Sequence, residues 1–209
     1  MDPTLAHPRF DAAPPAAAPR LLLDGRPGWQ RQGIDGAVVH WTGDAGPALA
    51  VARAIAATGF DPARAAAALA ATDGHFALAV AGANAVIASV DICRSTPLFH
   101  ATSPVTGTVI GSDARAVRDA GGATGWDPVP VLEFAMSGYV TGSDTLVRGL
   151  RQLRAGELLH VAADGQVRTA RWFDYCPAAA AQRSERALRE ELMAAIDAAT
   201  DRAIARATG

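Results

Sequence analysis

The stretch DGHFALAVAGANAVIASVDICRSTPLF, residues 73–99, decides the fold of this 209-residue chain. It holds two short apolar runs, residues 76–80 and 86–90, separated by the turn sequence Gly82-Ala83-Asn84. Short apolar runs bounded by turn residues are typical of strands, and so brief a connection makes them antiparallel neighbours. Because both runs are apolar almost throughout, we expect them to lie in a sheet that is covered on both faces.

Further strands and helices are predicted on both sides of this hairpin. Strands are predicted at residues 21–23, 37–41, 97–100, 108–110, 157–161 and 166–170, the last two flanking the hairpin signal Asp164-Gly165. Helices are predicted at residues 48–57 after Pro47, 62–71 after the N-cap Asp61, 114–117 after Ser112 or Asp113, and 128–136. No internal repeat is evident among these elements.

The C-terminal segment predicts one long amphipathic helix. Ser184 is a good N-cap for it. The apolar residues that recur at helical spacing on one face are Leu188, Leu192, Ile196, Ala199 and Ala203. We expect this apolar stripe to pack against the preceding sheet or against another domain.

Composition excludes several classes of protein and of chemistry. The formal charge of −2 gives no reason to expect a nucleic acid or an anionic membrane as partner. All 19 basic residues are arginines, which excludes a Schiff-base or phosphate-loop lysine. Two cysteines, Cys93 and Cys176, are too few and too far apart for a disulfide scaffold or a zinc site. We therefore expect a globular cytoplasmic protein, without a membrane-spanning segment or a secretory signal.

Five segments match, in order, a set of short motifs. Asp73–Leu78 is similar to "-G-x-F-A-", Asp91–Phe99 to "D-x-x-G-x-x-P-L-Y", Gly111–Val117 to "S-E-x-K-A-L", Gly138–Glu157 to "G-Y…T-x-x-x-G-I…L-x-P-G", and Arg171–Tyr175 to "Y-W-x-x". In this order and at this spacing the segments resemble the N-terminal domain of the asparagine-synthetase family.

The resemblance implies a fold and a partner. The fold is an α+β, N-terminal-nucleophile (Ntn) hydrolase-like sandwich of four αββα layers, two antiparallel sheets between helices, with a long C-terminal linker helix. The implied organisation is a disordered leader at residues 1–19, the glutaminase-like domain at residues 20–177, and at residues 178–209 a helix that leads to or docks on an ATP-pyrophosphatase synthetase domain. The "S-G-G-x-D-S" loop that marks the synthetase domain is absent from this chain. We therefore expect that domain as a partner, in cis or in trans, and expect it to hold ATP and Mg²⁺.

The chain departs from the family at the residues that carry glutaminase chemistry. The family nucleophile is a cysteine at the mature N-terminus, whose α-amino group serves as base, whereas this chain begins Met1-Asp2-Pro3. Cys93 follows a predicted strand, so exposing it as a terminus would delete two central strands, and Cys176 lies after the sheet. The "N-G-E" element is missing, and Thr42-Gly43-Asp44 only partly resembles the glutamine-binding "G-S-D". We therefore predict no catalytic, cofactor-binding or metal-binding residue in this chain.

Other polar residues have structural explanations. His40, His75, His100 and His160 lie in or beside predicted strands without metal-ligand spacing, which favours ordinary half-buried histidines. Asp91 with Arg94 is interpreted as a strand-end salt bridge or a turn. Cys93 is interpreted as an inert free thiol.

Three functions remain open from the sequence. The first is a catalytically silent domain of an ATP-dependent amide-forming ligase, as in β-lactam synthetases and lasso-peptide cyclases, which resemble this family and lack the nucleophile. The second is a free-standing module that binds a peptide or a partner, for example at an open sheet edge. The third is a hydrolase whose nucleophile, Thr4 or Thr42, is exposed by processing.

Overall fold

The computed structural model describes residues 18–176 and 183–208. These residues fall into two units, with the division between Asp174 and Tyr175. Part of the predicted leader, residues 1–17, lies outside the described residues, as does Thr4. Among the described helices, none combines the length and the apolar character needed to cross a membrane.

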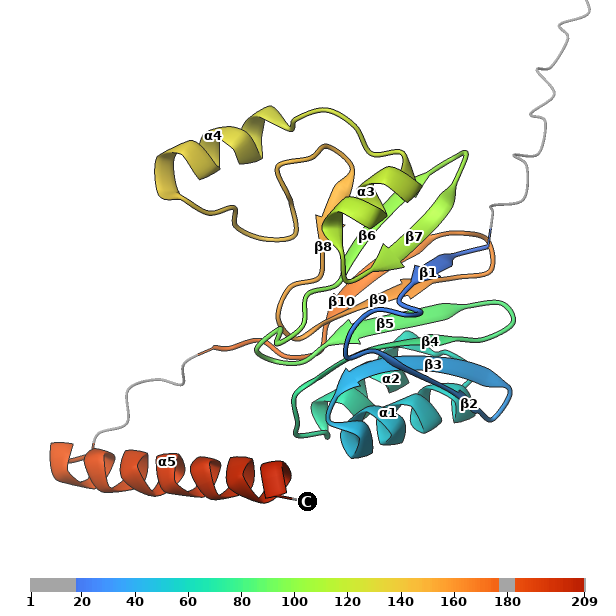
Figure 1. Ribbon diagram of the computed structural model, residues 1–209. Helices are drawn as coiled ribbons and strands as arrows, with labels where there is room; N and C mark the ends of the chain where they lie inside the picture. Colours follow the sequence, from blue (N-terminus) through green and yellow to red (C-terminus); the bar gives the residue numbers. More distant parts are fainter. Residues whose placement is uncertain (1–17, 177–182, 209) are drawn as a thin grey trace, which may run out of the picture. The chain divides into compact units, whose positions relative to one another are not determined.

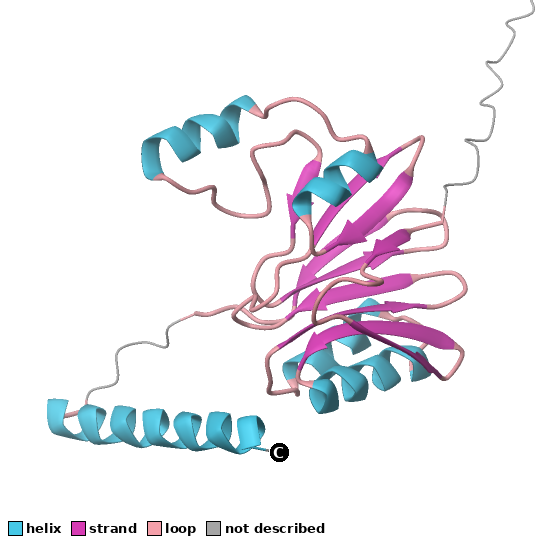
Figure 2. Cartoon of the chain, viewed as in Figure 1, coloured by secondary structure: helices cyan, strands magenta, loops and turns pink. Residues whose placement is uncertain are grey.

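The first unit contains two sheets (Figures 1 and 2). The six-stranded sheet has the order β10 (Val167–Arg171), β9 (Glu157–Val161), β5 (Val86–Val90), β4 (Phe76–Ala81), β3 (Ala37–Gly43), β2 (Gln30–Ile34), and all its pairs are antiparallel. The four-stranded sheet has the order β1 (Arg20–Leu22), β7 (Gly107–Gly111), β6 (Phe99–Ser103), β8 (Leu150–Gln152). The predicted hairpin of residues 76–90 is confirmed, and its strands are the two central strands of the larger sheet.

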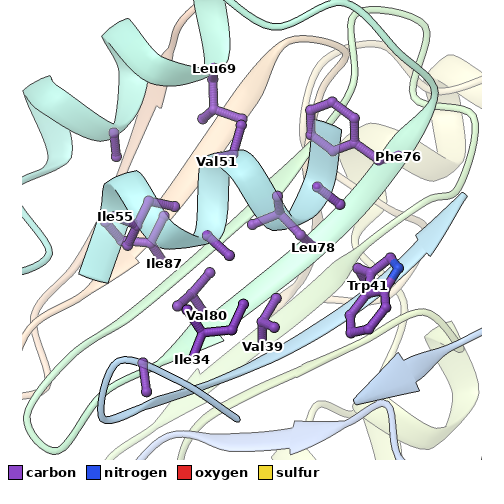
Figure 3. Close-up of a cluster of buried hydrophobic side chains, with 14 of the residues drawn as sticks. Ile34, Val39, Trp41, Val51, Ile55, Leu69, Phe76, Leu78, Val80 and Ile87 are labelled. Atoms are coloured by element: carbon purple, nitrogen blue, oxygen red, sulfur yellow. The ribbon is translucent and has the colours of Figure 1, made fainter. Parts of the chain in front are cut away.

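Helices cover the outer face of each sheet. α1 (Ala45–Ala57) and α2 (Pro62–Ala70) pack on the six-stranded sheet, and α3 (Ala114–Gly121) packs on the four-stranded sheet. Figure 3 shows the first of these contacts, with Val51, Ile55 and Leu69 of the helices against Leu78 and Val80 of β4. The inner faces of the two sheets form a second core. The molecule thus has four αββα layers, and the predicted fold class is confirmed.

Strand β4 shows how the sequence produces these layers. Phe76, Leu78 and Val80 belong to the core beneath α1 and α2. Ala77 and Ala79 belong to the core between the sheets, together with Ile110 of β7 and others. Because successive side chains of a strand point to opposite faces, a strand that is apolar at every position is covered on both sides. The prediction of a doubly covered sheet is therefore confirmed.

The structure differs from the prediction in three strands. β1 pairs with β7 in parallel, so the smaller sheet is mixed rather than antiparallel. β2 is an edge strand with mostly exposed polar residues, which hides it from a search for apolar runs. The sequence feature that indicates β2 is the hairpin turn Asp35-Gly36, which leads into β3. Both turn residues have positive φ angles, 47° and 78°. β8 has only three residues, too few for a visible pattern.

The last two helices are α4 and α5. α4 (Pro128–Ser137) is capped by Asp127, and only its Pro130 is buried. α5 (Glu185–Thr208) begins after Ser184, whose Oγ accepts a hydrogen bond from the Ala187 amide at 3.3 Å, as an N-cap does. The predicted long helix is therefore confirmed, with the apolar side chains of its stripe partly exposed.

Gly43 at the end of β3 provides a test of this architecture. Its φ is +85°, and a Cβ there would lie 2.1 Å from the carbonyl oxygen of His75, the residue just before the neighbouring strand β4. Replacing Gly43 by Ala therefore requires the backbones of β3 and β4 to separate, and we expect Gly43→Ala to lower the free energy of unfolding by about 3 kcal/mol or more.

The matched control is Gly36→Ala in the β2–β3 turn. Gly36 has a similar φ of +78°, but a Cβ there meets nothing within 4 Å. We expect this variant to lose only about 1 kcal/mol, from the left-handed backbone alone. Urea denaturation of both variants measures the difference, and equal losses would contradict the close approach of β3 and β4.

Candidate functional site

Two of the connections that pass between the sheets run side by side at one end of the sandwich. Residues 91–98 lead from β5 to β6, and residues 153–156 lead from β8 to β9. The Leu153 amide donates to the Leu98 carbonyl at 2.9 Å, and the Gly156 amide donates to the Asp91 carbonyl at 3.0 Å. The two connections are therefore joined to each other by backbone hydrogen bonds, the first beside β6 and β8 and the second beside β5 and β9.

The Asp91 carboxylate lies at the centre of this region and is only 1% exposed. Its Oδ2 accepts from the Phe76 amide at 2.9 Å, and its Oδ1 accepts from the amides of Cys93 at 2.8 Å and Ser95 at 3.2 Å. A buried carboxylate that accepts several amide hydrogen bonds replaces the water that those amides lose on folding. We call Asp91 and these three amides the Asp91 node.

Arg94 occupies the position where the resembling motif has a glycine. Its φ is +53°, the left-handed conformation that glycine adopts at least cost. Its amide donates to the Asp91 carbonyl at 3.1 Å, and its side-chain Nη1 donates to Oε1 of Gln152 on β8 at 2.7 Å. Of the two interpretations of Asp91 and Arg94, the turn is confirmed, and the salt bridge is wrong because each side chain bonds elsewhere.

Asp44 and His75 extend this network to the start of α1. The Asp44 amide donates to the His75 carbonyl at 2.8 Å, and the His75 amide donates to Oδ2 of Asp44 at 2.9 Å. His75 Nδ1 lies 3.2 Å from Oγ of Ser95. Asp44 lies in the segment that partly resembles the glutamine-binding "G-S-D". Its carboxylate binds the backbone just before β4 and so helps to position that strand beside β3.

Gly156 connects the last two resembling segments. It has a φ of +64°, and a Cβ there would lie 2.8 Å from both the Cβ and the carbonyl oxygen of Phe173. Its carbonyl accepts from the amides of Trp172 at 2.9 Å and Phe173 at 3.2 Å. The Trp172 indole donates to the buried Ser89 Oγ at 3.0 Å, so the end of the unit is fastened to the middle of the larger sheet.

Glu157 is a second buried carboxylate beside these connections. It accepts from the backbone amide of Arg154 at 2.7 Å and from its Nη2 at 2.9 Å. This pairing raises the pKa of Arg154, chiefly through the side-chain hydrogen bond. Like Asp91, Glu157 is satisfied entirely by groups that shape the loop, and this use of a carboxylate is structural.

Both cysteines are exposed free thiols. Cys93 lies just after β5, and its amide is bound in the Asp91 node. A cleavage that made Cys93 the terminus would remove β1 to β5, including β4 and β5 at the middle of the larger sheet. Cys176 lies beyond β10, the last strand. Both positions agree with those predicted from the sequence.

The four histidines predicted in or beside strands are not brought together, and their environments differ. His40 is buried on β3, with Nε2 2.9 Å from Oδ1 of Asp24. His100 is buried on β6, and loss of hydration, assisted by the positive charge of Arg151, lowers its pKa to about 4. Burial and the charge of Arg168 lower the pKa of the less buried His160. Within the described part of the chain, no group of three or more His, Cys, Asp or Glu residues is arranged to hold a metal ion.

An exposed apolar region at α4 was not anticipated from the sequence. The helix was predicted, but its exposure was not. One hollow of about 460 Å³ is lined by Trp126, Pro128, Val131, Phe134 and Leu146. Another, of about 640 Å³, involves Leu132, Met136 and Tyr139 among others. The sequence signal is that PVPVLEFAMS has one charged residue in ten, too few for a polar helix face.

Stability should depend on pH through His100. Its folded-state pKa of about 4 lies below the ordinary value of 6.5. Between these two pH values His100 is therefore protonated in the unfolded chain but neutral in the folded chain. We expect the free energy of unfolding to fall by up to about 3 kcal/mol as the pH drops from 6.5 to 4. His100→Leu should reduce this fall, as measured by urea denaturation across that range; the same slope in both proteins would disprove the assignment.

Asp91→Ala should be among the most damaging substitutions in the chain. It leaves three amides without their acceptor: that of Phe76, which is buried, and those of Cys93 and Ser95, which are partly buried. An unsatisfied buried amide costs about 1–3 kcal/mol, and the two partly buried amides add to this loss. We expect a loss of about 3 kcal/mol or more in the free energy of unfolding, measured by urea denaturation.

Asp164→Ala is the matched control for this substitution. Asp164 is exposed and accepts a single amide hydrogen bond, from Gln166 at 3.0 Å. Removing it should cost less than about 1 kcal/mol, since water replaces the lost acceptor. If the two variants were equally stable, the Asp91 node would not be a structural centre.

Comparison with known proteins gives structural likenesses alone. No protein-family model matches the chain, and no curated protein matches it. One similar structure is a glutamine phosphoribosylpyrophosphate amidotransferase from B. subtilis complexed with ADP and GMP, with a TM-score of 0.43, 16% identity, and coverage of 71% of this chain and 32% of that chain. Another is described as the allosteric regulatory enzyme of purine biosynthesis, with a TM-score of 0.41, 15% identity, and coverage of 71% and 31%. The chain thus spans about a third of the length of these proteins, and likenesses of this strength identify no activity.

Proposed function

We propose that this chain is the catalytically silent, glutaminase-like domain of an asparagine-synthetase-like, ATP-dependent amide-forming ligase. The observation that carries the proposal is the meeting of four of the five resembling segments at one end of the sandwich. Asp73–Leu78 and Asp91–Phe99 are joined through the Asp91 node, and Gly156 links Asp91 to Trp172 and Phe173. Segments matched in order along the sequence therefore also contact one another in space, as parts of one inherited framework do.

The residues of this framework support the silent assignment. The Asp91, Asp44 and Glu157 carboxylates all accept hydrogen bonds from backbone amides. The two thiols belong to Cys93, in the connection between the sheets, and Cys176, beyond the last strand. Neither has the terminal α-amine that the family's mechanism joins to its nucleophile.

The proposed ligase chemistry resides in a synthetase domain, in cis or in trans. Such a domain would bind ATP and Mg²⁺ and transfer AMP to a substrate carboxylate, releasing pyrophosphate. An amine of the same substrate would then displace AMP to form the amide or lactam. Because that amine replaces ammonia from glutamine, the present domain needs no nucleophile and serves as a packing platform. β-Lactam or lasso-peptide biosynthesis, in the cytoplasm, is the setting we propose.

A free-standing module of the same fold is the competing proposal. The exposed apolar region at α4 favours a partner-binding role and is compatible with both proposals. The two differ in whether a synthetase domain is encoded with this chain. Reading the neighbouring genes and the downstream frame for an "S-G-G-x-D-S" loop therefore separates them.

Incubation with glutamine tests the silent assignment. We expect the purified chain to release glutamate no faster than buffer, and the Cys93→Ala variant to behave identically, because neither Cys93 nor Cys176 carries a free α-amine that could serve as base. Coupled glutamate detection measures this, with an active class II glutaminase as positive control. Glutamate release that disappears in Cys93→Ala would refute the proposal.

A further inference from the structure

The helix α4 presents apolar side chains on opposite sides. Val129, Leu132 and Met136 are 73%, 61% and 80% exposed and line the 640 Å³ hollow. Val131 and Phe134 line the 460 Å³ hollow on the other side. A helix that is apolar all round is normally buried, and an exposed apolar surface of this kind marks an interaction site.

The ends of α4 are well formed. Asp127 Oδ1 accepts from the Val129 amide at 3.3 Å, and Gly138 ends the helix in the left-handed conformation with its amide bound to the Phe134 carbonyl at 2.8 Å. Figure 2 shows the helix standing at the side of the four-stranded sheet, carried by two loops. The binding element is therefore preorganised, which lowers the entropic cost of docking.

The charge of α4 restricts what can cover it. Glu133 is the only charged residue in the helix, and its carboxylate accepts from the amide and hydroxyl of Thr141. These bonds hold the Glu133 carboxylate, still negatively charged, against the loop that follows the helix, and the other side chains of α4 are uncharged. The complement of this surface is an apolar, uncharged groove with two walls, one for each side of the helix.

We propose that α4 is the docking element of this chain and inserts into an apolar groove of the synthetase domain. The inference rests on the proposed function, and it adds the surface through which the two domains associate. Trp126 and Tyr139 flank the helix and are 69% and 62% exposed. Large aromatic residues at the margins of an apolar helix are the residue types that contribute most to protein interfaces.

Two other occupants fit the helix less well. A second copy of the chain, meeting α4 across a twofold axis, would cover one side of each helix and leave the other side exposed. A lipid surface is bound by helices that carry basic residues on a polar face, and α4 has neither a basic residue nor a polar face.

The test is co-purification with the polypeptide that carries the "S-G-G-x-D-S" loop and is encoded with this chain. Leu132→Gln changes one side of α4 and Phe134→Gln the other, and both keep a good helix former. We expect each variant to weaken the complex at least tenfold and the double variant to abolish it, with the helical circular dichroism unchanged. Val105→Gln is the matched control, since Val105 is 88% exposed in the β6–β7 turn, outside α4, and should bind as the wild type does.

Each other outcome overturns a defined part of the inference. If the wild-type chain forms no complex, the proposed function fails and the docking site with it. A complex that survives the double variant leaves the proposed function standing and refutes the docking site. Sensitivity on one side only, with a dimer seen by light scattering, assigns α4 to a second copy. Sedimentation of the wild type, but not the double variant, with phosphatidylglycerol vesicles assigns it to a lipid surface.

Discussion

The Asp91 carboxylate satisfies three backbone amides at the point where the chain leaves the six-stranded sheet for the four-stranded one. The return connection passes beside it and is bound through Gly156 and Leu153. The Phe76 amide is buried and has no water to bond, so leaving it unpaired costs about 1–3 kcal/mol. Through the amides of Cys93 and Ser95 the same carboxylate also shapes the start of the connection, so one side chain ties this connection to β4. The close approaches at Gly43 and Gly156 become tolerable only because these positions lack a Cβ.

The sequence predicts the parts of the fold that rest on local pattern. The hairpin of residues 76–90, the caps at Asp61 and Asp113, and the helix after Ser184 all follow from apolar period and terminal residues. Strand β2 is not predicted, because an exposed edge strand needs no alternation of apolar residues, although the Asp35-Gly36 turn indicates where it ends. The parallel pairing of β1 with β7 is not predicted either. A strand of three residues carries no pattern from which the direction of the neighbouring strand could be inferred.

The candidate site depends on contacts that no local pattern contains. Asp91 can be recognised as part of a motif, but its bond to the Phe76 amide joins residues fifteen positions apart, and the contact of Ser89 with Trp172 spans 83. Arg94 illustrates the limit most clearly. In the sequence it is a charged residue beside an aspartate, which suggests an ion pair; in the structure its left-handed backbone matters, and its side chain reaches Gln152. The resembling motif carries the better information, because a glycine at that position signals the backbone angle.

The buried carboxylates and the exposed helix contribute differently to the fold. Asp91, Asp44 and Glu157 each accept hydrogen bonds from backbone amides at this end of the sandwich, so removing one of these carboxylates disturbs contacts that shape the sheets and their connections. Val129 and Met136 of α4 are largely exposed and contribute little burial to the fold, and exposed apolar side chains of this kind favour aggregation. The residues most informative about function are therefore those that the fold does not use, and α4 carries several of them.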